Sequence, residues 1–105
     1  MTTGMLVPVF AALGDETRWS ILEALGEGAA SASALASRLP ISRQAIARHL
    51  TVLQDVGLVR PVRAGREIQF EAIGSALSAT ARRLDAIGAE WDRRLAAIRD
   101  IAESL

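Results

Sequence analysis

The sequence predicts a mainly α-helical protein with a small β-hairpin, folded as a single domain over residues 1–105. Two observations predict this fold class. Half of the residues are hydrophobic but only 4% are aromatic, so the core must consist of Leu, Ile, Val and Ala, which favours helices over a β-sandwich or barrel. Apolar residues also recur at helical spacing in residues 16–25, 41–53 and 75–104, whereas residues 66–72 alternate apolar and polar side chains.

Residues 5–14 are expected to form a first helix, with Pro8 tolerated in its first turn. This segment is apolar on too many sides for a solvent-facing helix. We therefore expect Val9 and Phe10 to pack against the far end of the chain or against a second chain. A chain of this length buries only about 60–70% of its unfolded surface, so a dimer interface would add to its stability.

A second helix is predicted over residues 16–25, capped by Asp15 and ended by Gly26. Its inward residues are Ile21, Leu22 and Leu25. Trp19 is expected to pack in the core or in an interface rather than to stack on a ligand, because tryptophan usually contributes area to packing.

Residues 33–55 predict a helix-turn-helix, preceded by a small-residue link over 28–32 that suits a short strand. Pro40 prevents the first of its helices from continuing, and Ser42 is placed to cap the second. The second helix is apolar on one face, at Ile46, Leu50 and Leu53. The side chains on its other face are short, forked or cationic, which suits a helix that enters a DNA major groove. For the helix alone, a solvated surface helix is an equally good interpretation.

Residues 58–72 predict a β-hairpin, with a turn at Ala64-Gly65 and an edge strand that contains Pro61. Arg63 and Arg66 flank its tip. A cationic hairpin directly after a helix-turn-helix is the wing of a winged helix. The alternative interpretation of the tip is that its charges protect a sheet edge.

Residues 75–104 predict one long helix with a strict seven-residue apolar repeat, formed by Leu77, Leu84, Trp91, Ile98 and Leu105. Such a repeat is typical of a helix that packs on another long helix. Because no other segment is long enough, we expect a second copy of the chain as the partner. The predicted dimerisation helices are thus 5–14 and 75–104, and the predicted interface residues are Val9, Phe10, Leu77, Leu84, Trp91 and Ile98.

The charge is neutral overall but unevenly distributed. All twelve basic residues are arginines, and six of them lie between residues 38 and 66, where Asp55 is the only acid. A local positive field can steer a polyanion even when the total charge is zero. We expect double-stranded DNA as the partner, with only modest non-specific affinity. The predicted contacts are Ser42, Arg43, Gln44, Arg48, His49 and Thr51 on the recognition helix, and Arg63 and Arg66 on the wing.

Other functions receive less support. The chain contains no cysteine, so disulfides, thiolate metal sites and cysteine nucleophiles are excluded. No signal peptide or membrane span is recognisable, which predicts a cytoplasmic protein without a membrane partner. We find no phosphate-binding loop and no nucleophile–base pair, and we expect no catalytic residue, metal ligand or cofactor. Two alternatives to DNA reading stay open, namely a sensor of an organic small molecule that binds near Trp19 or Trp91, and a module for protein–protein contacts.

The sequence resembles the ArsR (arsenical resistance repressor) family of winged-helix regulators over about residues 10–72. The likeness lies in Ala11-Ala12-Leu13-Gly14-Asp15-Glu16-Thr17-Arg18, in Leu35-Ala36-Ser37-Arg38-Leu39 and in residues 41–50. It implies a homodimeric transcription factor, usually a repressor released by an inducer, that dimerises through its first and last helices. His49 occupies a position that the resemblance assigns to the recognition helix or its core-side edge, rather than to a metal site.

The sequence also departs from the metal-sensing members of that family. Those members carry a cysteine pair where this chain has Ser31-Ala32-Ser33, and others bind zinc through histidines on a last helix that here contains none. Zinc without a nitrogen or sulfur ligand would be weakly held. The sequence is therefore similar to a branch that lacks the metal-binding cysteines, whose members often have no known inducer.

Overall fold

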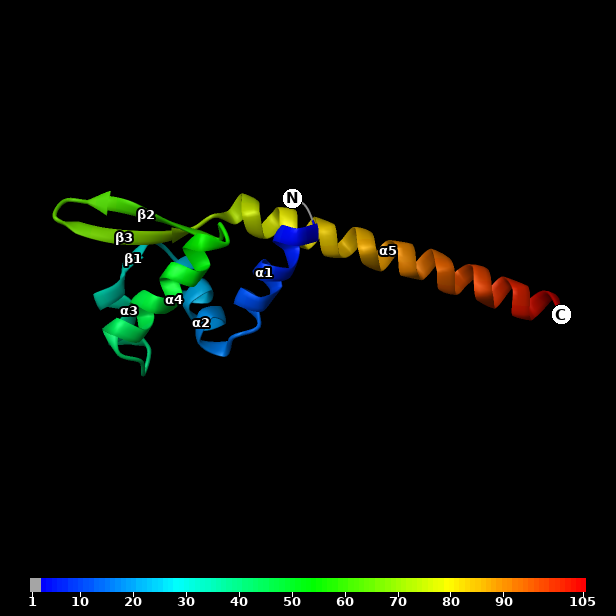
Figure 1. The fold of residues 1–105 in the computed structure, drawn as a ribbon, viewed down its shortest axis with the longest axis horizontal. Helices are drawn as coiled ribbons and strands as arrows, with labels where there is room; N and C mark the ends of the chain where they lie inside the picture. Colours follow the sequence, from blue (N-terminus) through cyan, green and yellow to red (C-terminus); the bar gives the residue numbers. More distant parts are fainter. Residues whose placement is uncertain (1–2) are drawn as a thin grey trace.

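The computed structural model describes residues 3–105 and confirms a mainly helical fold with a small antiparallel sheet (Figure 1). In chain order the elements are α1 (Thr3–Leu13), α2 (Glu16–Gly26), β1 (Ala30–Ser31), α3 (Ala32–Arg38), α4 (Arg43–Asp55), β2 (Val59–Ala64), β3 (Glu67–Ala72) and α5 (Gly74–Ser104). Helices α1 to α4 form a compact body, the β2–β3 hairpin extends from one end, and α5 projects from the other.

Side-chain caps fix where three of the helices begin. The Asp15 carboxylate accepts the backbone N–H of Arg18, the Ser31 hydroxyl accepts that of Ala34, and the Ser42 hydroxyl accepts that of Ala45. Each cap satisfies a backbone donor that a helix N-terminus otherwise leaves without a partner. The caps at Asp15 and Ser42 confirm the sequence predictions, whereas the Ser31 cap was not predicted.

The core is built from aliphatic side chains of every element of the body. Ile21, Leu35, Ile46, Leu50 and Leu53 are its largest fully buried members on the helices, and Leu58 and Val59 close it beside the hairpin. The predicted inward faces of α2 and α4 are therefore confirmed. Leu39, which follows the last residue of α3, is half-buried against this core.

The sheet has the strand order β1-β3-β2, so β2 is an edge strand. Pro61 lies in β2, as predicted, where its missing N–H removes no hydrogen bond from the centre of a sheet. Ala64 pairs with Glu67, so the turn consists of Gly65 and Arg66, one residue later than predicted. Gly65 has φ +65°, a left-handed conformation that glycine adopts without a steric penalty.

Two features of the terminal helices differ from the expectations. Helix α1 begins at Thr3, so Pro8 lies beyond its first turn, where it removes one helical hydrogen bond. Val9 is 0% exposed in the single chain because it packs within the core cluster. It therefore has no surface to offer a second chain, whereas Phe10 is half-buried and Val7 is 64% exposed.

Helix α5 leaves the body soon after it begins. Leu77 packs on the core and Thr80 is buried, but every residue from Ala81 to Leu105 except Ala96 is exposed. The molecule is consequently 69 Å long but only 25 × 24 Å across. Its radius of gyration of 18.5 Å exceeds the value of about 13 Å that a compact chain of 100 residues would have.

Candidate nucleic-acid interface

Helix α4 has one buried and one exposed face, and the exposed face carries most of the predicted DNA contacts. Ile46, Leu50 and Leu53 point into the core. Ser42, Arg43, Gln44, Arg48 and Thr51 are all exposed. We call these five residues the reading face. Guanidinium and amide groups on such a face match the hydrogen-bonding edges of guanine and adenine.

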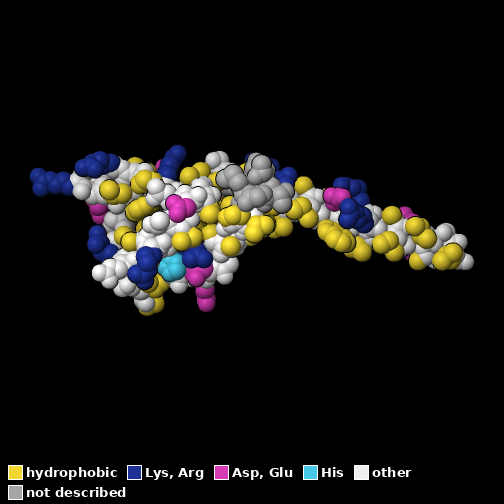
Figure 2. Space-filling model, in the orientation of Figure 1, with side chains coloured by type: hydrophobic (Ala, Val, Ile, Leu, Met, Phe, Trp, Pro, Cys, Tyr) yellow, Lys and Arg dark blue, Asp and Glu magenta, His cyan; other side chains and the backbone are white. Residues whose placement is uncertain are grey.

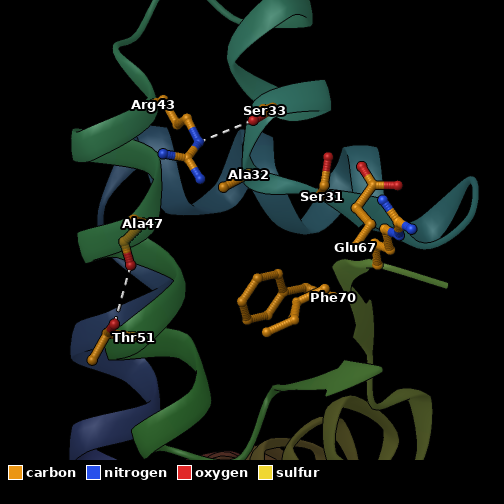
Figure 3. A pocket seen from close by; sticks show the side chains of 10 residues that line it. Ser31, Ala32, Ser33, Arg43, Ala47, Thr51, Glu67 and Phe70 are labelled. Atoms are coloured by element: carbon orange, nitrogen blue, oxygen red, sulfur yellow. Dashed lines mark hydrogen bonds between the residues drawn. The ribbon is translucent and has the colours of Figure 1, made fainter. Parts of the chain in front are cut away.

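The neighbouring helix α3 orients one residue of the reading face. Arg43 donates from Nε to the Ser33 hydroxyl at 2.9 Å, which anchors the side chain at one nitrogen. Its two terminal nitrogens stay available for a bidentate contact. Thr51 donates its hydroxyl hydrogen to the Ala47 carbonyl at 3.1 Å (Figure 3), so its methyl group and its oxygen lone pairs stay available for other contacts.

A groove of about 520 Å³ separates α4 from the hairpin. Arg43, Ala47 and Thr51 line it from α4, and Arg66, Glu67, Ile68 and Phe70 line it from the wing. Ser31, Ala32 and Ser33 line it from β1 and the start of α3. The sequence did not predict this groove, because it depends on how the hairpin is placed against α4.

The wing carries its arginines at its end, where Figure 2 shows basic side chains projecting from the molecule. Arg63 and Arg66 are exposed, and among the described residues neither makes an ion pair. Arg60 differs, because its Nε lies 2.6 Å from Glu71 on the adjacent strand. Arg38 is likewise paired with Glu27, at 2.8 Å. The positive field of the six central arginines is thus carried mainly by Arg43, Arg48, Arg63 and Arg66.

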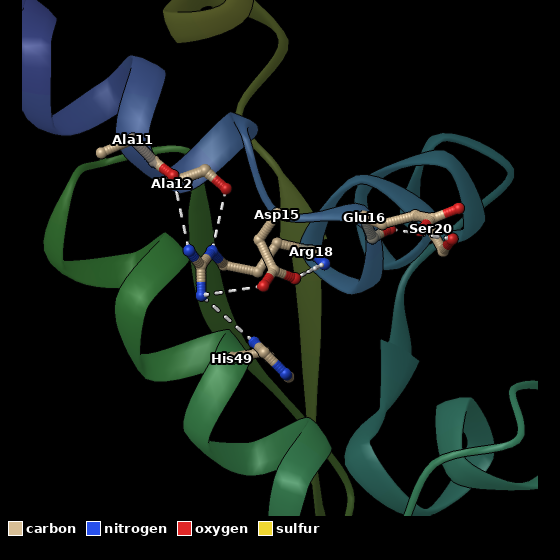
Figure 4. Close-up of polar contacts among 7 residues, drawn as sticks. All are labelled: Ala11, Ala12, Asp15, Glu16, Arg18, Ser20 and His49. Carbon is tan, nitrogen blue, oxygen red and sulfur yellow. Dashed lines mark hydrogen bonds and ion pairs between the residues drawn. The ribbon is translucent and has the colours of Figure 1, made fainter.

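His49 lies beside the reading face rather than on it. It is half-buried, and its Nδ1 is 3.3 Å from Nη1 of Arg18 on α2 (Figure 4). The same guanidinium donates to the carbonyls of Ala12 and Ala11 at 2.8 and 3.4 Å, and approaches the Asp15 carboxylate at 4.0 Å. Arg18 therefore connects the end of α1, the start of α2 and the middle of α4.

The comparisons with known proteins identify the family of this chain. A family model described as "Helix-turn-helix domain" matches residues 13–62 of the chain. The HTH-type transcriptional regulator Rv2034 of Mycobacterium tuberculosis is 37% identical over 95 residues, which cover 89% of this chain and 84% of that protein. A solved structure described as an ArsR-like transcriptional regulator from Rhodococcus is 62% identical, with a TM-score of 0.92, and the match covers 100% of this chain and 99% of that chain. The chain belongs to the ArsR family.

This ArsR-family protein is accordingly a transcriptional regulator with a helix-turn-helix DNA-binding domain, and the relatives are regulators rather than enzymes. A further structural match is the homodimeric winged helix-turn-helix DNA-binding domain of Mb0332 from Mycobacterium bovis. That chain is 24% identical, with a TM-score of 0.66, over 88% of this chain and 82% of its own. At this identity the match shows the fold alone.

The chain contains no cysteine, so this regulator lacks the metal-binding cysteines of other members of the family. Among residues 3–105, no group of three or more His, Asp or Glu side chains gathers where a metal ion could be held. Within the same residues, no helix is both long enough and apolar enough to span a membrane.

Proposed function

We propose that this regulator is a homodimer that binds an inverted-repeat operator and represses transcription from it. In each subunit the reading face of α4 would enter the major groove, and Arg63 and Arg66 of the wing would contact the flanking backbone or minor groove. The observation that carries this proposal is the exposed cationic face of α4, which has no ion pair among residues 3–105 and is held on a fully buried apolar face.

Three features support the DNA contact and the dimer in this proposal. Arg48 is exposed at the centre of the reading face, and among the described residues it has no acidic partner. The exposed apolar stripe along α5 supports a dimer, and the related fold of Mb0332 is homodimeric. A two-fold dimer places two recognition helices about one turn of DNA apart, about 34–36 Å, and this spacing requires an operator with two-fold symmetry.

Replacement of Arg48 tests the reading face. We expect Arg48→Ala to lose specific operator binding, because a bidentate arginine–guanine contact contributes about 1–3 kcal/mol of discrimination per half-site. The operator is first obtained by selection from random DNA and must appear as an inverted repeat. Binding is then measured at several salt concentrations, since loss of affinity with salt reports phosphate contacts and separates DNA reading from a role in protein contacts alone.

The matched control is Arg82→Ala, which removes the same charge from an exposed position on α5, on the side of the helix opposite the apolar stripe. This variant should bind the operator as the wild-type chain does. Equal footprints for Arg48→Ala and the wild-type protein would disprove the assignment of the reading face. Repression itself is tested by transcription in vitro from a promoter that overlaps the operator, where added protein must lower the transcript yield.

A further inference from the structure

A side-chain contact between Ser33 and Arg43 joins the two helices of the helix-turn-helix. The two residues are ten positions apart, and Nε of Arg43 donates to the Ser33 hydroxyl oxygen at 2.9 Å (Figure 3). Arg48 is the other arginine of the reading face, and its side chain makes no hydrogen bond within residues 3–105. Of these two arginines, only Arg43 is therefore held in one orientation before DNA is present.

The nitrogen that Ser33 occupies decides how Arg43 can meet a base. A guanidinium group is a planar fork with five N–H donors. It can pair with two acceptors either through its side edge, which uses Nε and one Nη, or through its end edge, which uses both Nη atoms. Because the Nε–H of Arg43 is bonded to Ser33, only the end edge is left. Guanine offers two adjacent acceptors, O6 and N7, that match this edge.

Ser33 is attached to a part of the fold that is itself fixed. Ser31, two residues earlier, is 6% exposed, and its hydroxyl accepts the backbone N–H of Ala34 at 3.0 Å. Ser31 also pairs with Gln69 of β3 in the sheet. The first turn of α3 is thus tied to the strands of the wing. A binding side chain keeps its geometry best when the group that supports it lies on such a rigid element.

The support is neutral, so it leaves the charge of Arg43 available. Glu67 lines the same groove, but it lies on the wing across from α4 (Figure 3), and Arg43 makes no ion pair within residues 3–105. A carboxylate partner would have to be displaced by DNA. A serine hydroxyl orients the guanidinium group without neutralising it.

We propose that Ser33 is a positioning residue for operator recognition, which holds Arg43 end-on so that each half-site is read for one guanine. The inference rests on the proposed function and deepens it. Immobilising a long side chain on binding lowers affinity by about 2- to 12-fold. With Ser33 in place, Arg43 is already ordered in the free protein. The gain is realised only where the base presents two acceptors to the end edge, so Ser33 acts on selectivity without contacting the DNA.

Replacement of Ser33 tests the proposal. The base read by Arg43 is located first, as the operator position at which selection from random DNA by Arg43→Ala loses the guanine preferred by the wild-type chain. Ser33→Ala should lower the preference for guanine at that same position by about 2- to 12-fold. The other positions and the salt dependence should stay unchanged, because no phosphate contact is removed. Ser33→Thr retains the hydroxyl and should restore the preference.

Ser37→Ala is the matched control, because it removes the same group from an exposed position one helical turn later on α3. The Ser37 hydroxyl donates to the Ala34 carbonyl at 2.7 Å and does not contact α4, so operator preference should not change. Alanine favours helices at least as well as serine, and urea denaturation should therefore show no loss of stability for Ser33→Ala. Combining Ser33→Ala with Arg43→Ala should give the binding of Arg43→Ala alone, since Ser33 acts through Arg43.

A measurement without DNA checks the contact itself. In the free protein, ¹⁵N relaxation of the Arg43 Nε–H group reports its motion on the picosecond-to-nanosecond timescale. The group should be ordered in the wild-type chain and in Ser37→Ala. In Ser33→Ala its order parameter should fall toward the values below about 0.6 that flexible groups show.

Three results would overturn the proposal. Ser33→Ala could keep the full guanine preference, weaken binding to all sequences alike as loss of a phosphate contact would, or weaken binding further in the Arg43→Ala background. Each of these, with specific binding by the wild-type chain, would refute the role of Ser33 and leave the proposed function intact. A wild-type chain that binds no operator would instead refute the proposed function, and the inference with it, even where relaxation shows Arg43 held by Ser33.

Discussion

Arg18 joins three helices through a single guanidinium group. It donates to two carbonyls at the end of α1, lies near Asp15 at the start of α2, and contacts His49 on α4. Shared hydrogen bonds of this kind fix the relative positions of elements more firmly than apolar packing alone. The orientation of the reading face therefore depends partly on a residue that does not lie on it.

The Asp15 end of this network gives a pH dependence with a definite sign. Its pKa lies below the ordinary value of 3.8, because the carboxylate accepts the backbone N–H of Arg18 and lies near the Arg18 charge. A carboxyl group whose pKa is lower in the folded than in the unfolded chain stabilises the fold at pH values above its unfolded pKa. This stabilisation is lost as the pH falls through the pKa of the folded state. Asp15→Asn retains a capping oxygen without the charge. In urea titrations the difference in unfolding free energy between the two proteins should be largest near pH 6 and should shrink below pH 3.8.

A constant difference down to pH 2 would show that the Asp15 charge contributes nothing to the fold. Glu103→Gln, at the exposed end of α5, is the control and should give no pH-dependent difference.

For single residues, the sequence predicted contacts between near neighbours in the chain well and contacts between residues far apart in the chain poorly. The caps by Asp15 and Ser42 are local hydrogen bonds that the spacing alone suggests. The contact between Arg18 and His49 joins residues 31 positions apart, and the contact between Arg43 and Ser33 crosses the helix-turn-helix. No pattern along the chain encodes either contact. A contact of His49 with DNA stays a prediction, and its half-buried position beside Arg18 makes it a weaker candidate than the exposed Arg48.

The two faces of α4 have separate roles that neighbouring substitutions can distinguish. Leu50 is 1% exposed in the core, so Leu50→Ala should lower the unfolding free energy by about 2–5 kcal/mol. Thr51→Ala, at the next position but on the reading face, should change stability by less than about 0.5 kcal/mol. Thermal and urea denaturation of both variants check this expectation. Similar losses for the two would contradict the assignment of α4 to one buried and one exposed face.

Helices and strands were predicted to within a few residues wherever periodicity and caps agreed. The predicted helix of 75–104 corresponds to Gly74–Ser104, and the predicted hairpin of 58–72 corresponds to Val59–Ala64 and Glu67–Ala72. The burial of individual apolar residues was harder to predict. Val9 and Trp19 are both apolar and near the N-terminus, yet one is 0% and the other 52% exposed. Which of them packs inward depends on the angle at which α1 and α5 meet α2, and composition does not determine that angle.

The body of the molecule has its own buried core, whereas the apolar stripe of α5 is exposed in the single chain. Ile98→Asp should therefore weaken dimerisation without unfolding the body, because it places a charge in the apolar stripe, where Ile98 is 62% exposed in the single chain. Sedimentation equilibrium should show a larger monomer fraction than for the wild-type protein, and operator affinity should fall with it. Arg82→Ala serves again as the control. A variant that remains fully dimeric would remove Ile98 from the predicted interface.

The projecting α5 also affects how the protein behaves in solution. An object 69 Å long and 25 Å wide experiences more friction than a sphere of the same mass, so a single chain should elute early from a gel-filtration column. A monomer calibrated against globular standards would be mistaken for a dimer. A dimer formed through the exposed stripe of α5 would place the two projecting helices side by side, so the friction per unit mass should fall on association. Light scattering, which reports mass independently of shape, is therefore the measurement that distinguishes the two states.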